Sequence, residues 1–450
     1  MLLSGCSADL GSSLGLDSGG GLFQGSGTGT KALVVGDEPY AVQAGAQILR
    51  QGGSAADAAT AMYFALSVTY PVAAGLGGGG ICIVHDTASG QTEEFDFLAR
   101  DAASGGAYAV PGNVRGFALM QSLYGHTQWQ RDIAPAEGYA AAGFPISHAL
   151  AARVTAAKDV IRLDAALAAE FLDESGAPKP VGTIVINPDL AGSLSQIRTG
   201  GADALYRSSL GARVIAYSQT QGGAIGVPEF ARYQVRRTQP QVMQIGNQVA
   251  YLPNRSTGAG TFAGTLFDIL ARALETPTGE NDIQASVVVA VKDSLKQFGV
   301  TSLPPDLGAT GFAATDSNGQ SVSCAVTMNG PFGSGHIATG TGITLARAPS
   351  SGDAGLSAAF LTPVIATEGS GGSLTLAIAG SGGPNGTAAV GYALSRMSRG
   401  DSMTRANDLK STGVAPNETV NAIACQGGLC VALPDPGANG LGAAGDVPAK

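Results

Sequence analysis

The chain has 450 residues, of which 44% are hydrophobic and only 13% charged, and its formal net charge is −9. No block of five or more basic residues occurs, which argues against a nucleic-acid-binding surface. No run of 18 apolar residues occurs either, so no segment is expected to span a membrane. The length and the apolar content allow one large α/β domain, and the 67 glycines indicate tight turns and closely packed backbone.

The N-terminus carries Leu3-Ser4-Gly5-Cys6, which resembles a bacterial lipobox. Only five residues precede Cys6, whereas a working signal peptide needs an apolar stretch of about 7–15 residues. Residues 12–31 are rich in Gly, Ser, Thr and Asp, a composition typical of a flexible linker. We expect Cys6 to anchor the protein in the bacterial cell envelope through a lipid; the alternative is a chance cysteine in a disordered tail. A Cys6→Ala change in the full-length gene should then release the protein from membranes.

The first hundred residues predict helices followed by a hairpin. Apolar residues recur at helical spacing and stop at Gly52-Gly53, and Ser54 with Asp57 has the chemistry of a helix N-cap. The expected elements are helices Ala41–Gln51 and Ser54–Val68, a glycine loop at Gly77–Gly80, and strands Ile81–His85 and Thr92–Phe97.

Helices dominate the middle of the chain and strands the last third. The Asn-Gly pair at 318–319, between two alternating runs, is a strong hairpin signal. We expect residues 111–175 to be mostly helical, and residues 205–235 to hold a further helix. The later elements are predicted as strand Met243–Leu252, helices Phe262–Leu274 and Ser286–Phe298, strands Thr310–Thr315, Ser321–Met328, Thr362–Thr367 and Ser373–Ala379, a glycine loop and helix Gly380–Met397, and a disordered tail Pro434–Lys450.

The cysteines and histidines indicate neither a metal site nor a cofactor. Cys425 and Cys430 bracket a four-residue loop that could close as a disulfide. Cys82 and Cys324 lie in apolar strand-like runs, and we expect buried free thiols there. The four histidines are scattered without metal-binding spacing.

Several segments of the sequence, taken together, are specific for one protein family. The chain resembles the γ-glutamyltranspeptidase family over about residues 32–270 and 308–395. The matching motifs are Ala44–Gly80 with its helices and glycine loop, Val110–Phe117 (VPGNVRGF), Gly201–Val214, Phe230–Val235, Tyr251–Phe262 (YLPNRSTGAGTF), Asn329–Gly335 (NGPFGSG) and Ala379–Gly383 (AGSGG).

The resemblance implies an α/β (α+β) fold, the four-layer αββα sandwich of N-terminal-nucleophile hydrolases. It divides the chain into a tether (1–31), a large-subunit-like region (32–308), a small-subunit-like region (309–432) and a tail (433–450). Family members cleave themselves, and the new N-terminal threonine attacks a γ-glutamyl amide, as in glutathione metabolism. Backbone N–H groups of Gly382 and Gly383 match the family's oxyanion hole.

The sequence departs from the family where the catalytic threonine belongs. Counting back from Asp316, the ungapped match places Ala309 on the nucleophile and Thr310 one position later. In one interpretation Thr310 is the nucleophile and the strand has slipped by one residue, which would need a bulge or deletion to compensate. In the other the nucleophile is lost and Thr310 is an ordinary strand residue.

The family's substrate anchors are also altered. Arg100 lies two residues after the ungapped position of the arginine that grips the glutamyl carboxylate, and the alternative is a surface arginine paired with Asp101. Asn329 is retained, Ser357 remains where the family has paired serines, and Asp353 is the nearest acid after the TGITL segment. Arg100, Asn329 and Ser357 are our candidate substrate-binding residues.

We therefore predict an envelope amidohydrolase or acyltransferase of the γ-glutamyltranspeptidase type, with Thr310 as nucleophile and a small γ-glutamyl or related amide as substrate. The alternative is an inactive, non-processing relative that acts as a binding or structural lipoprotein. The oligomeric state does not follow from the sequence.

Overall fold

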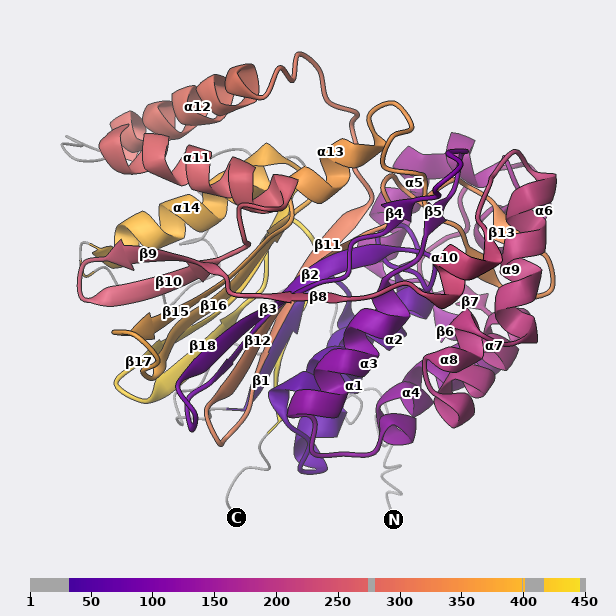
Figure 1. Cartoon of the computed structure of the whole chain (residues 1–450), viewed down its shortest axis with the longest axis horizontal. Helices are drawn as coiled ribbons and strands as arrows, with labels where there is room; N and C mark the ends of the chain where they lie inside the picture. The colour runs from indigo at the N-terminus through magenta and orange to yellow at the C-terminus, as the bar shows by residue number, and fades with distance from the viewer. Residues whose placement is uncertain (1–31, 274–279, 399, 401–416, 446–450) are drawn as a thin grey trace, which may run out of the picture.

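The computed structural model describes residues 32–273, 280–398, 400 and 417–445. Two antiparallel sheets stack face to face between two layers of helices, so the predicted four-layer αββα sandwich is confirmed (Figure 1). One sheet has the order β19 (Leu441–Ala444), β1 (Leu33–Gly36), β11 (Ala309–Thr315), β12 (Gln320–Thr327), β2 (Gly79–Asp86), β3 (Gln91–Asp96) and β8 (Arg236–Thr238). The other has the order β18 (Leu429–Leu433), β17 (Thr419–Gln426), β16 (Leu374–Ser381), β15 (Thr362–Glu368), β10 (Gln248–Leu252) and β9 (Gln241–Ile245).

Helices cover the outer face of each sheet. On the seven-stranded sheet lie α1 (Pro39–Arg50), α2 (Ala55–Thr69) and α3 (Asn113–Tyr124), followed outward by α4 (Trp129–Ala142), α5 (His148–Ile161), α6 (Ala165–Phe171), α7 (Pro188–Gly200), α8 (Asp203–Tyr206), α9 (Ser209–Thr220) and α10 (Val227–Ala231). On the six-stranded sheet lie α11 (Gly258–Ala273), α12 (Glu280–Gln297), α13 (Ala354–Ala359) and α14 (Pro384–Ser398). Short two-stranded pairs complete the fold: β4 (Arg100–Asp101) with β5 (Ala109–Val110), β6 (Phe144–Pro145) with β7 (Ile184–Val185), and β13 (Ile337–Ala338) with β14 (Ile343–Thr344).

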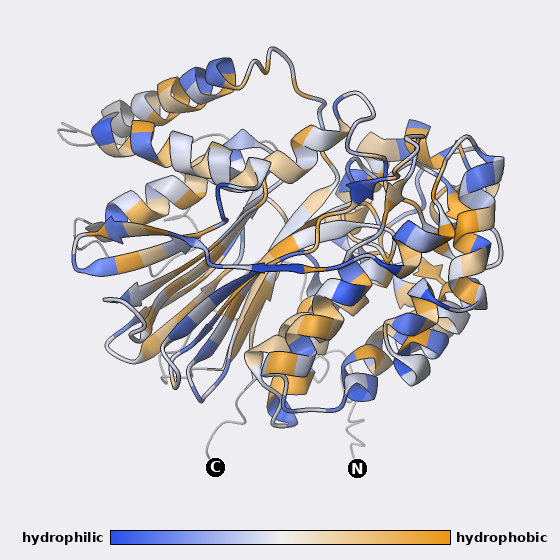
Figure 2. Cartoon of the chain, viewed as in Figure 1, coloured by the Kyte–Doolittle hydropathy of each residue, from blue (hydrophilic) through white to orange (hydrophobic). Residues whose placement is uncertain are grey.

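The local chemistry of α2 explains its position at the centre of the helix layer. Ser54 caps the helix as predicted, because its hydroxyl accepts the Asp57 N–H while the Asp57 carboxylate accepts the Ser54 N–H. Every residue of α2 is buried, and its many alanines let neighbouring helices and the sheet approach closely. Figure 2 shows apolar residues gathered on the strands and the inner helices, while α12 alternates polar and apolar residues on the outside of the molecule.

Residues 32–308 and 309–445 interleave within both sheets. In the first sheet β11 and β12 lie between β1 and β2, and in the second β15 lies beside β10. The two subunit-like regions predicted from the sequence therefore build one common core, with an apolar layer between the sheets formed by residues such as Val35, Ala313 and Ile423.

Two predictions about the chain's ends and strands need correction. Residues 434–445 are not a disordered tail, because β19 pairs with β1 and its Leu441 and Ala443 pack on the helix-side core. The single strand expected at 243–252 is a hairpin, β9 and β10, that turns at Gly246, whose φ is 58°.

The cysteines of the described residues form two disulfides. The prediction of free thiols at Cys82 and Cys324 is wrong: both are buried, but they are directly opposite partners in the β2–β12 ladder and are bonded to each other. Cys425 and Cys430 are paired across β17 and β18. The expected lipidation site, Cys6, lies outside the described residues, so the envelope location stays a prediction. Within the described ranges no helix is both long and apolar enough to cross a membrane.

Candidate active site

The strand β11 begins at the two residues that the sequence left in competition. It pairs with β12 without a bulge, from Ala309 opposite Thr327 to Thr315 opposite Ser321. Alternate residues of a strand face opposite sides, and Phe312 packs in the helix-side core whereas Ala313 packs between the sheets. The ladder is therefore regular: Ala309 faces the other sheet, and Thr310 faces the helix layer.

Thr310 is fully buried and its hydroxyl is bonded to a buried carboxylate. Thr310 Oγ1 donates to Asp37 Oδ2 at 2.7 Å. Asp37 follows β1 directly and receives two more hydrogen bonds from β17: Thr419 Oγ1 at 2.9 Å and Asn421 Nδ2 at 2.7 Å. Asn421 Nδ2 also donates to the Gly311 carbonyl at 2.9 Å. Both sheets thus contribute to one polar cluster around Asp37.

The electrostatics of Asp37 combine two opposing effects. Burial raises the pKa of its carboxyl, and nearby Asp435 raises it further, while the hydrogen bonds from Thr310, Asn421 and Thr419 lower it. All three partners can donate, and an ionised carboxylate can accept all three hydrogen bonds. A carboxylate with a raised pKa is a stronger proton acceptor than one in water.

A buried arginine holds the other side of the Ala309–Thr310 peptide. Arg153 comes from α5 and its Nη1 donates to the Ala309 carbonyl oxygen at 3.0 Å. Its Nε lies 3.0 Å from Asp306 Oδ2, and Nη2 contacts the other carboxylate oxygen, so the pair is bidentate. The guanidinium also lies over the Tyr70 ring, 5.3 Å from its centroid.

The two residues before Ala309 are hydrogen-bonded to polar side chains of the site. The Leu307 carbonyl accepts the Ser357 hydroxyl at 2.6 Å, and the Gly308 carbonyl accepts the Thr327 hydroxyl at 2.9 Å. Gly308 has a φ of 61°, and a Cβ there would lie 1.9 Å from the Gly330 carbonyl oxygen. The backbone just before β11 therefore requires glycine at position 308. In the uncleaved chain the hydroxyl of Ser357 is already bonded to the Leu307 carbonyl.

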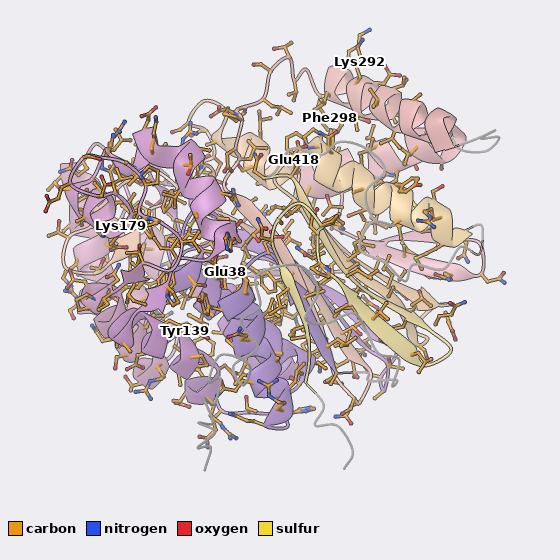
Figure 3. The ribbon with its side chains drawn as sticks, turned by 180° about the vertical axis from the view of Figure 1, so that it is seen from behind. Glu38, Tyr139, Lys179, Lys292, Phe298 and Glu418 are labelled. Atoms are coloured by element: carbon orange, nitrogen blue, oxygen red, sulfur yellow. A yellow bond between two sulfur atoms is a disulfide. The ribbon has the colours of Figure 1, made fainter. Side chains whose placement is uncertain are left out.

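The predicted oxyanion-hole glycines lie beside this cluster. Ser381, which ends β16, pairs with Thr419, and their hydroxyl oxygens are 3.1 Å apart. Gly382 and Gly383 are the next two residues of the chain after Ser381. A Cβ at Gly382 would lie 1.9 Å from the Asn417 carbonyl oxygen, and one at Gly383 would lie 1.9 Å from Glu418 Oε1. Figure 3 labels Glu418 where the strands of the second sheet reach the outer helices.

The remaining candidates, Asn329 and Arg100, make their hydrogen bonds and ring contacts with residues other than Thr310. Asn329 has a φ of 58° and donates its side-chain N–H to the Arg347 carbonyl at 2.8 Å. Arg100 does not pair with Asp101; its guanidinium lies 4.8 Å from the Tyr233 ring centroid, and its buried Nη2 has no hydrogen-bond partner among the described residues. Asp353, the nearest acid after the TGITL segment, pairs with Arg347 at 2.9 Å.

Sequence reasoning missed Asp37, Arg153 and Asp306, which surround the Ala309–Thr310 peptide. No local motif identifies them, because Asp37 is 273 residues and Arg153 is 156 residues from the groups they contact. The local signal is limited to an aspartate directly after the apolar strand Leu33–Gly36.

The comparisons agree with this architecture. The sequence profile of the family described as Gamma-glutamyltranspeptidase matches residues 41–291, more than half of the chain. The chain is 28% identical over 362 residues to glutathione hydrolase 2 of Arabidopsis thaliana, covering 67% of this chain and 62% of that protein. It is 32% identical over 251 residues to the glutathione hydrolase proenzyme of Escherichia coli K12, covering 51% and 43%. The solved structure of cephalosporin acylase from Bacillus halodurans superposes with a TM-score of 0.73 at 17% identity, covering 95% of this chain and 99% of that one.

The stacked sheets, with a buried hydroxyl at the start of a central strand, define the class of N-terminal-nucleophile hydrolase folds. Within that class, the profile match assigns the chain to the γ-glutamyltranspeptidase family. The chain spans less than two thirds of the length of the Arabidopsis relative.

Proposed function

We propose that the chain is a γ-glutamyltranspeptidase-type amidohydrolase or acyltransferase that cleaves itself before Thr310 and then uses Thr310 as its nucleophile. The observation that carries the proposal is the hydrogen bond from the Thr310 hydroxyl to the buried Asp37 carboxylate, at the start of the strand where the family keeps its nucleophile. A threonine hydroxyl is a weak nucleophile unless a base is in contact with it. Several relatives carry the word proenzyme in their names, which supports processing.

Cleavage would supply what the reaction still lacks. The new α-amine of Thr310 has an ordinary pKa of about 8, so it can act as the base for later turnovers. Release of the segment that ends at Ala309 would free the hydroxyl of Ser357 from Leu307 for a substrate. The N–H groups of Gly382 and Gly383 would then be candidates to bind the oxyanion of a γ-glutamyl or related amide.

The test is the intact mass of the purified chain after reduction and long incubation. We expect two fragments, residues 1–309 and 310–450, and hydrolysis of a γ-glutamyl anilide by the cleaved protein. Thr310→Ala should abolish both, while Thr310→Ser keeps a hydroxyl and should still be cleaved. A wild-type chain that stays whole, or a Thr310→Ala chain that is still cleaved there, contradicts the proposal.

The second candidate is a non-processing relative that binds a partner or ligand without catalysis. The regular β11–β12 ladder favours this candidate, because no bulge moves Thr310 into the position that Ala309 occupies in the ungapped match to the family's nucleophile. Thr310 is also fully buried. Ala309 itself packs in an apolar cluster with Ile81, Ala325 and Leu361. A single full-length chain without anilide hydrolysis would support this candidate over the first.

A further inference from the structure

Building on the proposed function, we infer that Asp37 and Arg153 are the catalytic residues of self-cleavage. Asp37 takes the proton from the Thr310 hydroxyl, and Arg153 stabilises the negative charge that develops on the Ala309 carbonyl oxygen. The two groups contact the two reacting partners of a single peptide bond, the nucleophile from one side and the carbonyl oxygen from the other.

Asp37 meets the requirements of a proton acceptor. Its Oδ2 is 2.7 Å from Thr310 Oγ1, within the range for direct proton transfer. The carboxylate is only 1% exposed, so water does not compete for the hydroxyl. Thr419 and Asn421 fix its orientation from the second sheet, and the side chain needs no rearrangement before the transfer.

Arg153 meets the requirements of an oxyanion-stabilising group. Its Nη1 already donates to the Ala309 oxygen at 3.0 Å in the uncleaved chain. The side chain is 4% exposed, and Asp306 holds the opposite edge of the guanidinium. A positive charge that is buried from bulk solvent stabilises a developing oxyanion far more than it would in solution. Asp306 acts here as a positioning residue, since it touches Arg153 and not the reacting atoms.

The step balances as an N-to-O acyl shift followed by hydrolysis. Thr310 Oγ1 bonds to the Ala309 carbonyl carbon while its proton passes to Asp37, and the tetrahedral oxyanion faces Arg153. The carbon–nitrogen bond then breaks, and the proton on Asp37 goes to the departing Thr310 nitrogen. The product is an ester between Ala309 and the Thr310 oxygen. Water hydrolyses this ester to a carboxylate on Ala309 and a free hydroxyl and amine on Thr310.

The experiment follows the rate of fragment appearance in full-length protein under reducing conditions. Asp37→Asn keeps the shape of the side chain but removes the base, and we expect cleavage at least about 100-fold slower. Arg153→Lys keeps a charge for Asp306 but loses the planar fork, and we expect about 100-fold slowing. Matched controls are Asp316→Asn, a buried aspartate bonded to the Ala55 N–H, and Arg115→Lys, which contacts Tyr233 and Asp203. Both controls should cleave at the wild-type rate.

Hydroxylamine separates chemistry from folding. It attacks esters, so it should speed fragment release in the wild type and leave a hydroxamate on Ala309. Because Asp37→Asn and Arg153→Lys slow the step that forms the ester, hydroxylamine should not restore their cleavage. Circular dichroism and thermal melting of the same samples should show that both variants are folded.

The outcomes distinguish this inference from the proposed function. If the wild type never cleaves, the proposed function falls and the roles of both residues fall with it. If the wild type cleaves before Thr310 but folded Asp37→Asn and Arg153→Lys cleave as fast, the proposed function stands and the assignment of these two residues is overturned. If hydroxylamine leaves no hydroxamate on Ala309 in a cleaving wild type, the acyl-shift step is overturned.

Discussion

Asp37 and Asp57 are both buried aspartates, yet the chain uses them in different ways. The carboxylate of Asp37 accepts hydrogen bonds from the side chains of Thr310, Thr419 and Asn421, which belong to the candidate active site. Asp57 accepts the backbone N–H groups of Ser54, His126 and Thr127, and it joins the start of α2 to the loop before α4. A carboxylate that accepts several backbone N–H groups holds the segments that carry them together, because a buried N–H group needs an acceptor.

We predict that Asp57→Ala lowers the free energy of unfolding by about 2–5 kcal/mol, since it leaves one buried and two partly buried N–H groups without this acceptor. The control is Asp159→Ala, which removes an exposed ion pair with Arg162 and should change stability by less than about 0.5 kcal/mol. Urea unfolding followed by circular dichroism measures both. Equal effects of the two substitutions would mean that Asp57 does not hold these segments together.

At the scale of elements, the strand β2 depends on glycine where it passes the chain segment after β3. A Cβ at Gly79 would lie 1.9 Å from the Ala99 backbone nitrogen and 2.6 Å from the Leu98 carbonyl carbon. Backbone atoms cannot move aside as a side chain can, so the close approach requires the missing side chain. The glycine run that marked the family in the sequence is thus a packing requirement of this strand.

Gly79→Ala should therefore cost about 1–3 kcal/mol or more in stability, because the strand or its neighbour must shift. Gly138, in the middle of α4, offers the opposite case: nothing lies within 4 Å of an added Cβ. Gly138→Ala should raise stability by about 0.5–1 kcal/mol through helix propensity. Melting temperatures of the two variants should move in opposite directions, and a stable Gly79→Ala protein would contradict the packing described for β2.

Sequence patterns predicted the elements well where a local signal exists. Ser54 and Asp57 marked the start of α2, and Asn318-Gly319 marked the turn between β11 and β12. Sequence patterns failed where an element depends on a contact that is distant in the chain. The strand β19 forms because it pairs with the edge of β1, which lies about 400 residues earlier in the sequence. The same limit applies to the site. A glycine motif suggested Gly382 and Gly383 as candidates for the oxyanion hole, and this assignment stays a prediction. The partners of Thr310 come from tertiary contacts that a single sequence does not encode locally.

At the scale of the whole molecule, buried acids set the response to pH. Burial raises the pKa of Glu38 to about 7, and of Glu94, Asp132 and Glu170 to about 8. Glu38 lies in the middle of the molecule at the start of α1 (Figure 3). Between the ordinary pKa of a carboxyl and these values, the folded chain holds protons that the unfolded chain has released. Folding therefore takes up protons, and stability falls as the pH rises through this window.

We predict that the melting temperature is higher near pH 5 than near pH 8, with the decline spread over the range from about 4.5 to about 8. Glu170→Gln should flatten part of this decline, because glutamine keeps an oxygen to accept the hydrogen bond from Asn187 without titrating. The comparison of wild-type and variant melting curves across this pH range checks the sign. Greater wild-type stability at pH 8 than at pH 5 would show that other groups dominate.

The disulfide between Cys82 and Cys324 has a consequence for the two products of the proposed self-cleavage. One cysteine lies before the Ala309–Thr310 bond and the other after it, so the severed polypeptides would remain a single covalent molecule in an oxidising compartment. The strands reinforce this, because β1 of one product lies between β11 and β19 of the other. The cleaved protein would then gain a new chain terminus inside its fold without becoming two separable subunits, and only a reductant together with unfolding would separate the two polypeptides.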